Sequence, residues 1–426
     1  MALRLTRALS HRNYRLFFYG QSVSLVGTWI TRVAVSWLVY RLTGSELLLG
    51  IVGFAGQIPT LLLGPLAGVI VDRHNRHRML IWTQAASLVQ SVLLAVLTLA
   101  DVITVPHLVL LQLLQGVINA FDTPARQTLV VEMVTNRSDV PNAIALNSSM
   151  VNGSRVIGPA IGGVIIAAVG EGWCFAIDAV SYVGVIVSLL LMRLEPRPHD
   201  ARALPMLDDL RSGFQYVRDS VPIRSGLVLL AIISTAGVPY TVLMPAVVDE
   251  TFGGGPDLLG WLMGAIGIGA LAGALYLANR ETVVGLGRVI LIGALSFGAG
   301  LVIFSMTSSI WLAAPTLAVA GAGFIVQAAS TNTIIQTIVD ERFRGRVMAF
   351  YTMAFFGSVP VGSLISGVVA TYIGATATIR VGGLVCIVAG LWFAMRLPVL
   401  RAAVRPIYIS RGIIAPPDVD PGGTAG

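Results

Sequence analysis

The feature that most constrains this chain is a series of long apolar runs separated by short polar gaps. A helix needs about 20 apolar residues to cross a bilayer. In lipid, a helix satisfies every backbone hydrogen-bonding group within one segment. The sequence therefore predicts membrane helices near 14–40, 46–71, 79–100, 105–122, 142–168, 173–192, 225–248, 257–279, 287–306, 309–330, 347–371 and 376–397.

The composition supports a membrane protein and excludes two other classes. Only 12% of the residues are charged, roughly half the share in a soluble domain. All 28 basic residues are arginine, and a standard ATP-binding P-loop requires a lysine, so the chain lacks that ATP-binding motif. A net charge of +7 would suit a nucleic-acid partner in a soluble protein. Here the charges lie between apolar runs, so we assign them to orientation in the bilayer and expect no nucleic-acid partner.

The arginines collect in alternate gaps, and the other gaps are sparse and mostly acidic. The basic gaps are the N-terminus, 73–78, 126–137, 193–224, 280–288, 342–346 and the tail from 396 to 411. Because positive charge favours the cytoplasmic side, both termini are predicted to be cytoplasmic, which requires an even number of spans. The first run is too long for a cleaved signal peptide, so we expect a multi-pass protein of the inner or plasma membrane.

The longest polar gap divides the chain into two halves. We predict an N-terminal six-helix bundle at 1–192, a cytoplasmic linker at 193–224, a C-terminal six-helix bundle at 225–397 and a cytoplasmic tail at 398–426, disordered at its end. Within the linker, LDDLRSGFQYV has apolar residues at helical spacing. That helix either lies on the bilayer surface or is a solvated linker helix.

The two halves repeat. Ser154, Gly158 and Gly162 share one helix face, and Ser358, Gly362 and Ser366 repeat the pattern 204 residues later. Two repeated six-helix halves are typical of secondary transporters, whose substrate site lies between the repeats.

The segment GVIVDRHNRHR ends an apolar run with one carboxylate followed by several basic residues. It resembles the loop signature between helices two and three of the major facilitator superfamily, filled here by Gly68, Asp72, Arg73, Arg76 and Arg78. GPAIGG, at 158–163, resembles the fifth-helix signature of the superfamily's exporters. Shorter phrases resemble the drug and siderophore exporters related to macrolide-efflux proteins and the enterobactin exporter: LTGS (42–45), DTPARQ (122–127), NAIALNSS (142–149), FAIDAVSY (175–182) and RGRVM (344–348).

The resemblance implies a fold and a function. The fold is an all-α integral membrane protein with twelve transmembrane helices in two pseudo-symmetric six-helix bundles. The function is secondary active export of an amphipathic small molecule, an antibiotic or a siderophore, by alternating access and proton antiport, with no cofactor. An uptake permease of the same fold is the first alternative. An integral-membrane enzyme would need clustered His, Asp or Glu at one membrane surface, and the sequence suggests no such cluster or catalytic residue.

The resemblance also implies a conformational latch at Asp72. A carboxylate at a helix N-terminus is stabilised by about 0.3–1 kcal/mol, and the family's acid is expected to meet helix eleven when the cytoplasmic side is closed. Arg76, Arg126 and Arg346 are the candidate partners. The alternative is a solvated turn that follows the positive-inside rule.

The fifth-helix motif consists of Ser154, Gly158, Pro159, Gly162 and Gly163. Small residues let helix backbones approach closely, and a proline loosens the helix locally. The resemblance implies a tight, bendable contact between the two halves. The alternative is ordinary packing of small residues.

Charges within the spans are costly and usually functional. Arg32 and Asp178 lie at similar predicted depth, so we expect them to pair, either structurally or in proton coupling. Arg155 lies nearer the middle, where it meets either an anionic substrate or neighbouring asparagines. Proton antiporters of the superfamily often carry an arginine at the position of Gln112, so Asp178 and Asp122 are the remaining candidate proton carriers.

Four amide side chains complete the candidate substrate cavity: Gln57, Gln115, Asn119 and Gln327. Each either contacts substrate or makes an interhelical hydrogen bond worth about 0.6 kcal/mol. His74 and His77 lie in a basic loop, which favours solvated side chains over a metal pair, so no metal site is predicted.

Overall fold

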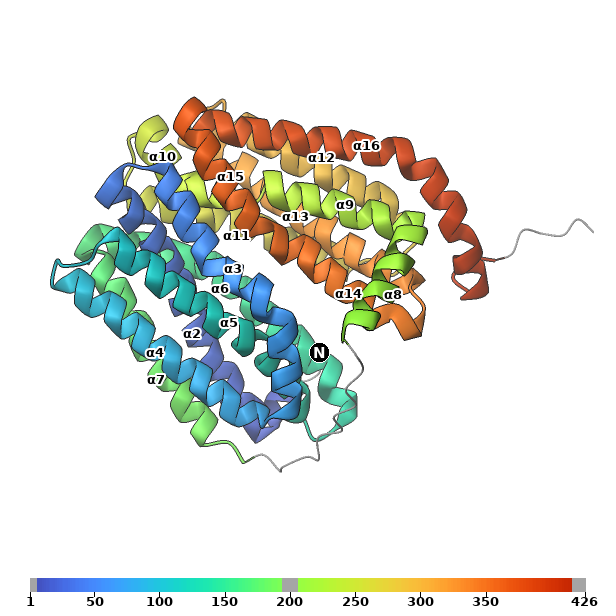
Figure 1. Ribbon diagram of the computed structural model, residues 1–426, viewed down its shortest axis with the longest axis horizontal. Helices are drawn as coiled ribbons and strands as arrows, with labels where there is room; N and C mark the ends of the chain where they lie inside the picture. The colour runs from blue at the N-terminus through green and yellow to red at the C-terminus, as the bar shows by residue number, and fades with distance from the viewer. Residues whose placement is uncertain (1–5, 194–205, 416–426) are drawn as a thin grey trace, which may run out of the picture.

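A computed structural model describes residues 6–193 and 206–415 as an almost entirely helical protein (Figure 1). The side chains of Pro65, Asp72 and residues 206–210 lie outside this description. Twelve spans in the described chain are long and apolar enough to cross a membrane. The predicted fold class, twelve transmembrane helices in two six-helix bundles, is confirmed.

The first bundle contains one helix per span. Its helices are α2 (Arg12–Thr43), α3 (Glu46–Arg73), α4 (Arg76–Leu99), α5 (Val105–Glu132), α6 (Val140–Val169) and α7 (Glu171–Leu190). Helix α5 continues about ten residues beyond the predicted run at 105–122. Leu129 and Val130 are buried in this extension, and Asp122 and Arg126 pair one turn apart at its start.

The second bundle follows a short helix, α8 (Met206–Asp219). Its helices are α9 (Val221–Ala236), α10 (Tyr240–Phe252), α11 (Pro256–Ala278), α12 (Leu286–Phe304), α13 (Ile310–Ile338), α14 (Arg344–Thr352), α15 (Ser358–Ile373) and α16 (Ala375–Ser410). Two spans are interrupted. Helices α9 and α10 form one span that breaks at Gly237 and Pro239, and a π-helical turn at Met353–Gly357 joins α14 to α15.

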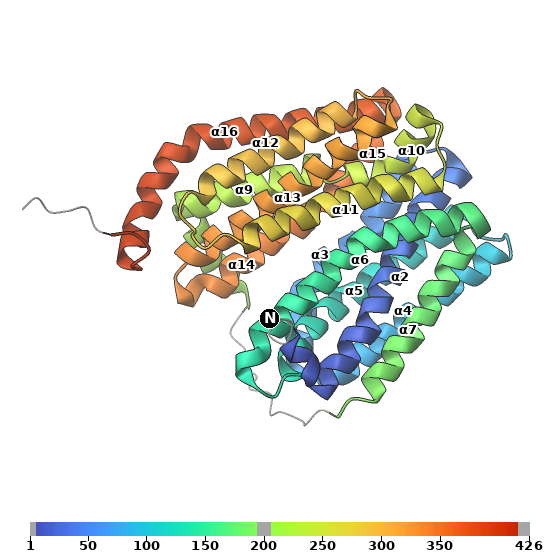
Figure 2. The same ribbon diagram turned by 180° about the vertical axis from the view of Figure 1, so that it is seen from behind.

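Helix α16 is longer than the sequence predicted. The predicted run at 376–397 continues to Ser410, through Pro398 and Pro406. Val404 and Tyr408 remain buried in this extension, so packing against the second bundle maintains the helix where two prolines would be expected to end it. Figure 2 shows α16 curving along this part of its length.

The signature GVIVDRHNRHR folds as two helices joined by a two-residue turn. Helix α3 ends at Arg73, and only His74 and Asn75 separate it from α4. The side chain of Asn75 accepts a hydrogen bond from the backbone N–H of Arg78 at 3.0 Å, which caps the first turn of α4.

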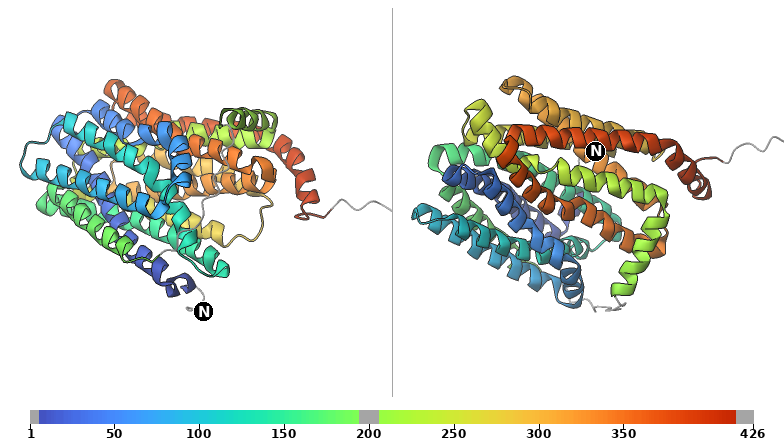
Figure 3. Two further views of the ribbon diagram at one scale, coloured as in Figure 1. Left: turned by 60° about the horizontal axis from the view of Figure 1, so that its bottom comes forward. Right: turned by 45° about the horizontal axis from the view of Figure 1, so that its top comes forward.

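The two bundles touch along α6 and α11 and along α3 and α15. Figures 1 and 3 show them in contact near α10 and diverging toward α8 and α14. We name these the α10 end and the α8 end. Gly163 meets Gly260 and Gly50 meets Gly367 where the bundles are joined. We therefore describe the structure as closed at the α10 end and open toward the α8 end, where the bundles diverge.

Helix α8 packs on the end of α14. The rings of Tyr216 and Phe343 stack with centroids 4.5 Å apart, and Arg346 donates to the hydroxyl of Ser212 at 2.9 Å. The predicted linker helix therefore contacts the second bundle. The rest of the linker, 194–205, and the end of the tail, 416–426, lie outside the described residues.

Candidate functional site: a cavity between the two bundles

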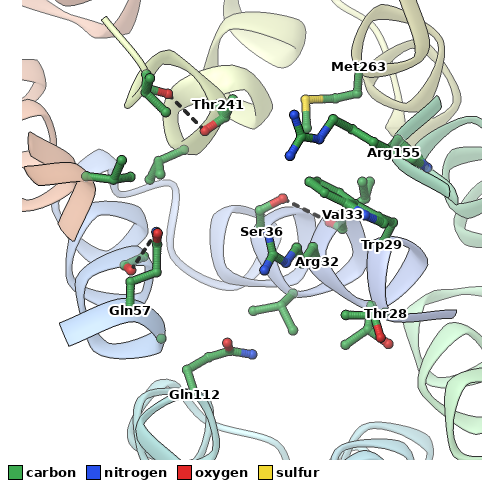
Figure 4. A pocket seen from close by; sticks show the side chains of 18 of the residues that line it. Thr28, Trp29, Arg32, Val33, Ser36, Gln57, Gln112, Arg155, Thr241 and Met263 are labelled. Atoms are coloured by element: carbon green, nitrogen blue, oxygen red, sulfur yellow. Dashed lines mark hydrogen bonds between the residues drawn. The ribbon is translucent and has the colours of Figure 1, made fainter. Parts of the chain in front are cut away.

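A cavity of about 330 Å³ lies between the two bundles, within the range of small-molecule sites. Residues of all six helices of the first bundle, α2 to α7, line it, and residues of α10, α11, α13, α15 and the π-helical turn line it from the second. Figure 4 shows part of this lining. Both halves contribute, so a molecule bound here contacts both.

Two arginines and one tryptophan form the most unusual part of the lining. The guanidinium carbons of Arg32 and Arg155 lie 4.7 and 5.3 Å from the ring centroid of Trp29. In Figure 4 the indole lies between the two guanidinium groups. Such contacts are attractive because the face of an aromatic ring carries a negative electrostatic potential. Neither arginine has a carboxylate within 4.0 Å among the described residues.

Gly158 creates the space for this arrangement. A Cβ on Gly158 would collide with the Cβ of Trp29, so α2 and α6 pack closely only because this residue is glycine. Arg155 precedes Gly158 by three residues and therefore lies on the same face of α6. The first glycine of the fifth-helix motif thus positions the arginine and tryptophan beside each other.

The rest of the fifth-helix motif divides between two contacts. Gly162 lies against Ile30 of α2, within the first bundle. Gly163 lies against Gly260 of α11, in the second bundle, and the carbonyl oxygen of Pro159 approaches the same glycine. Ser154 is buried, and its hydroxyl donates to the Met150 carbonyl at 2.8 Å. Gly163 thus lies at a close contact between the bundles, and Gly158 and Gly162 at close contacts within the first bundle. That the contact between the bundles bends stays a prediction.

Amide side chains line the cavity on the α3 and α5 side. Gln57, Gln115 and Asn119, predicted from the sequence, all line it, and Gln112 joins them. Gln115 donates to the Asn119 side-chain oxygen at 3.2 Å. These amides present neutral donors and acceptors to a bound molecule.

Gln327 is placed elsewhere. It does not line the cavity, it is fully buried, and it donates to the hydroxyl of Thr331 at 3.3 Å on its own helix. A Cβ on Gly293 of α12 would lie 3.1 Å from the Gln327 side chain. The close approach of α12 and α13 therefore covers the face of α13 that carries Gln327, which the sequence pattern had suggested for substrate.

Asp178 is buried, with 1% exposure, and lines the cavity. Its carboxylate accepts hydrogen bonds from Thr31 at 2.8 Å and Ser91 at 3.1 Å. The predicted pairing with Arg32 is wrong. Thr31 directs its hydroxyl toward α7, and the next residue of the helix, Arg32, points about 100° away into the cavity.

Asp122 lies outside the cavity lining. It accepts from Thr83 at 2.9 Å and Gln84 at 2.6 Å, and its other oxygen lies 3.6 Å from Arg126. The i,i+4 spacing of Asp122 and Arg126 would have predicted this pair. Asp122 thus belongs to a hydrogen-bonded cluster of the first bundle.

The predicted latch residues lie at the α8 end. The side chain of Asp72 falls outside the described residues. Arg73 and Arg78 are exposed, and Gly68 faces open space. Arg76 donates to Glu132 at 2.5 Å. The latch stays a prediction.

The sequence analysis did not predict two polar contacts at the α10 end. The hydroxyl of Tyr40 on α2 donates to Glu250 at 3.0 Å and approaches Asp249 at 3.4 Å, both from the second bundle. Arg41 donates twice to Glu171, at 2.7 and 3.2 Å. The tyrosine contact joins the bundles, and the arginine contact joins α2 to α7.

The histidines of the basic loop make backbone contacts. A ring nitrogen of His74 lies 2.8 Å from the Ile70 carbonyl, and one of His77 lies 2.8 Å from the Leu189 carbonyl. In the part of the chain that the structure describes, no group of three or more His, Cys, Asp or Glu residues is arranged to hold a metal ion.

Twelve spans in two bundles around a shared cavity define a membrane transporter of the major facilitator fold. Solved structures share this fold. A bacterial homologue of the lysosomal transporter Spinster, in an inward-facing conformation, is 14% identical with a TM-score of 0.67 over 93% of this chain and 98% of that chain. An inward-facing bacterial homologue of ferroportin is 16% identical with a TM-score of 0.65 over 89% and 98%.

Residues 6–412 match the family model of transmembrane secretion effectors, and the chain belongs to that family. The staphyloferrin A transporter of Staphylococcus aureus is 27% identical, covering 90% of this chain and 96% of that protein. The multidrug efflux pump Tap of Mycolicibacterium fortuitum is 25% identical over 93% and 95%. Macrolide efflux protein A of Streptococcus pyogenes is 22% identical over 88% and 95%. The family and these relatives are transporters, not enzymes.

Proposed function

We propose that this protein exports an amphipathic small molecule across the inner or plasma membrane by alternating access. The observation that carries the proposal is the cavity between the bundles, lined by both halves and open toward one end. The names of the relatives, which include a siderophore transporter and multidrug and macrolide efflux proteins, support export. The substrate is therefore a siderophore or an antibiotic-like molecule.

In this proposal the α8 end is cytoplasmic, and so are both termini. Arg73, Arg78, Arg137 and the arginines at 342–346 lie at helix ends or in connections at that end, as the positive-inside rule requires. The proposal keeps the division into two bundles (1–192 and 225–397), a linker (193–224) and a tail (398–426), although α9 begins four residues before 225 and α16 extends to Ser410. The structure then represents the inward-open state, which receives substrate from the cytoplasm.

We further propose that protons drive export and that Asp178 carries them. It is a buried carboxylate at the cavity wall, and its hydrogen-bond donors are neutral hydroxyls. A carboxylate in such surroundings can gain and lose a proton without breaking an ion pair. Asp122 is the second candidate carrier, although it lies outside the cavity lining.

Proton release from inverted membrane vesicles tests this function. A pH gradient is set, and macrolides, lipophilic cations and catecholate siderophores are added in turn. We expect one compound class to dissipate the gradient in vesicles that contain the protein and not in matched vesicles without it. Accumulation of the same compound against its gradient in right-side-out vesicles would instead indicate an uptake permease and overturn export.

A further inference from the structure

The charge of the cavity is unbalanced. Its charged lining residues are Arg32, Arg155 and Asp178. Asp178 is held by hydroxyl donors on α2 and α4 and makes no ion pair with either arginine. The cavity therefore presents two guanidinium groups whose charge no protein carboxylate among the described residues neutralises.

The guanidinium N–H groups of the two arginines also have no hydrogen-bond acceptor among the described residues. The Nε of Arg155 is buried and has no hydrogen-bond partner. Arg32 is exposed into the cavity, and its described contact is the ring of Trp29 at 4.7 Å. A contact with an aromatic ring uses none of the N–H groups of a guanidinium for hydrogen bonds, so those groups remain available to a ligand. A guanidinium edge matches the two oxygens of a carboxylate.

Nearby carboxylates are engaged elsewhere. Asp249 and Glu250 accept from Tyr40 at the α10 end, and Asp122 accepts from Gln84 within the first bundle. In the proposed transport cycle the α8 end closes over the cavity. Two uncompensated cations shielded from solvent in the middle of a membrane protein are costly. An anion bound between them removes this cost.

We propose that Arg32 and Arg155, presented on Trp29, form an anion subsite, and that the transported molecule is an organic acid with an apolar or aromatic body. The inference rests on the proposed function and names its substrate class: carboxylates and acidic phenols, rather than lipophilic cations. The second bundle offers apolar side chains to the body of the molecule, among them Met263, Phe324 and Phe355. The amides of Gln57 and Gln112 suit neutral polar groups.

Ligand-induced thermal stabilisation of the purified full-length protein tests the subsite directly. The probes are citrate, 2,3-dihydroxybenzoate and 2-naphthoate at millimolar concentration, each beside its neutral amide, and 2-naphthylmethylamine as the cationic counterpart of naphthoate. We expect at least one acid to raise the unfolding temperature while its amide and the amine do not. Equal effects of acid and amide, or no effect of any acid, would overturn the subsite.

Variants locate the effect. Arg32→Gln and Arg155→Gln should each weaken the apparent affinity for the acid at least about tenfold, whereas Arg155→Lys, which keeps the charge, should retain the preference for acids. Arg396→Gln is the matched control, because Arg396 also lies over a tryptophan, Trp392, at 5.6 Å but outside the cavity. An acid effect that survives both cavity substitutions would overturn the assignment.

Vesicle transport separates this inference from the proposed function. If acids are exported and Arg155→Gln abolishes that export, both the anion subsite and the export function are supported. Export of cations or neutral macrolides but not acids overturns the anion subsite and leaves export standing. Acids that bind with the expected variant pattern but are never exported support the subsite and overturn the export function.

Discussion

Gly163 of α6 and Gly260 of α11 lie so close that a Cβ on either residue would be 2.9 Å from the Cα of the other. Gly50 of α3 and Gly367 of α15 repeat this contact, with corresponding distances of 2.8–2.9 Å. Gly163 and Gly367 occupy equivalent positions in the two halves of the sequence. The closed α10 end is therefore built from two pseudo-symmetric glycine pairs that join the bundles.

Gly163→Ala should open this contact. The new methyl group cannot fit against α11, so the α10 end separates and the inward-open state loses stability relative to the outward-open state. We expect transport to fall at least about tenfold, the effect of a shift of 1.4 kcal/mol, while the protein still inserts normally. The measurement is export from cells, together with labelling of Ser36→Cys, in the cavity lining, by an impermeant thiol reagent from outside.

Gly153→Ala is the matched control, because a Cβ on this glycine of the same helix meets nothing within 4 Å. Equal transport by the two variants, or unchanged labelling in Gly163→Ala, would show that the glycine pair does not hold the α10 end closed.

Tyr40→Phe should weaken the same end by removing one hydroxyl. The substitution deletes the hydrogen bond to Glu250 at 3.0 Å, and a bond to a charged group is worth about 1.5–3 kcal/mol. We expect the outer labelling of Ser36→Cys to increase and substrate affinity measured from the cytoplasmic side to decrease. Tyr19→Phe, an exposed tyrosine whose hydroxyl has no described partner, should leave both unchanged. A Tyr40→Phe protein that labels like the parent would contradict the prediction.

Arg41 and Glu171 should show a coupled effect on stability. The Glu171 side chain is 6% exposed and Arg41 is 51% exposed, so the pair is partly screened by solvent. Arg41→Gln leaves a buried carboxylate without its cation. Because Arg41 is half exposed, we expect a solvent-screened loss of about 1 kcal/mol in unfolding free energy. The double variant with Glu171→Gln should regain most of that loss. Thermal unfolding in detergent measures the cycle, and additive losses would exclude the coupling.

Asp178→Asn should separate substrate movement from proton movement. Asparagine preserves the size of the side chain and can still accept from Thr31, so the fold should be retained. It cannot exchange a proton. We expect counterflow exchange of substrate to continue without pH dependence, while proton-driven accumulation is lost. Asp122→Asn gives the comparison, because Asp122 lies outside the cavity. Loss of coupling in Asp122→Asn alone would transfer the carrier role to that residue.

Asp72→Asn tests the latch inferred from the loop signature. Folding and membrane insertion should be intact, and transport should fall at least about tenfold, because the outward-open state loses a contact at the closed cytoplasmic side. Asp101→Asn, in a polar gap on the other side of the membrane, is the control. Protein abundance and export are measured in the same cells. Full transport by Asp72→Asn would leave the solvated turn as the explanation of the motif.

The sequence predicted the spans well and the side-chain partners less well. Apolar runs identified all twelve spans because lipid imposes one solution on the backbone. The sequence analysis missed the break at Gly237 and the length of α16. At both places, packing against neighbouring helices decides whether a glycine or proline interrupts the helix. Helix ends are set by caps and tertiary contacts more than by hydropathy.

The cavity shows the same division. Gln57, Gln115 and Asn119 line it as predicted, and Arg155, predicted as a functional charge within the membrane, lines it as well, because a polar group inside a span needs a polar environment. Gln327 is also a polar residue within a span, but it donates a hydrogen bond to Thr331 of its own helix and packs against α12 instead of the cavity. Arg32 and Asp178 occur at similar depth yet point in different directions. The rotation of each helix about its axis decides these directions, and residue spacing within one helix does not reveal it.

The sequence by itself determined the membrane class, the number of spans and the repeat of two halves, and it suggested candidate functional residues, because these follow from hydrophobicity, helical periodicity and motif spacing. Only the tertiary structure decided which partner each of those residues meets. Gly158 faces Trp29 and Gly163 faces Gly260, one within a bundle and one between bundles, although both belong to a single six-residue motif. The physical reason is that a helix turns about 100° per residue, so neighbours in sequence contact different helices, and their roles depend on how those helices pack.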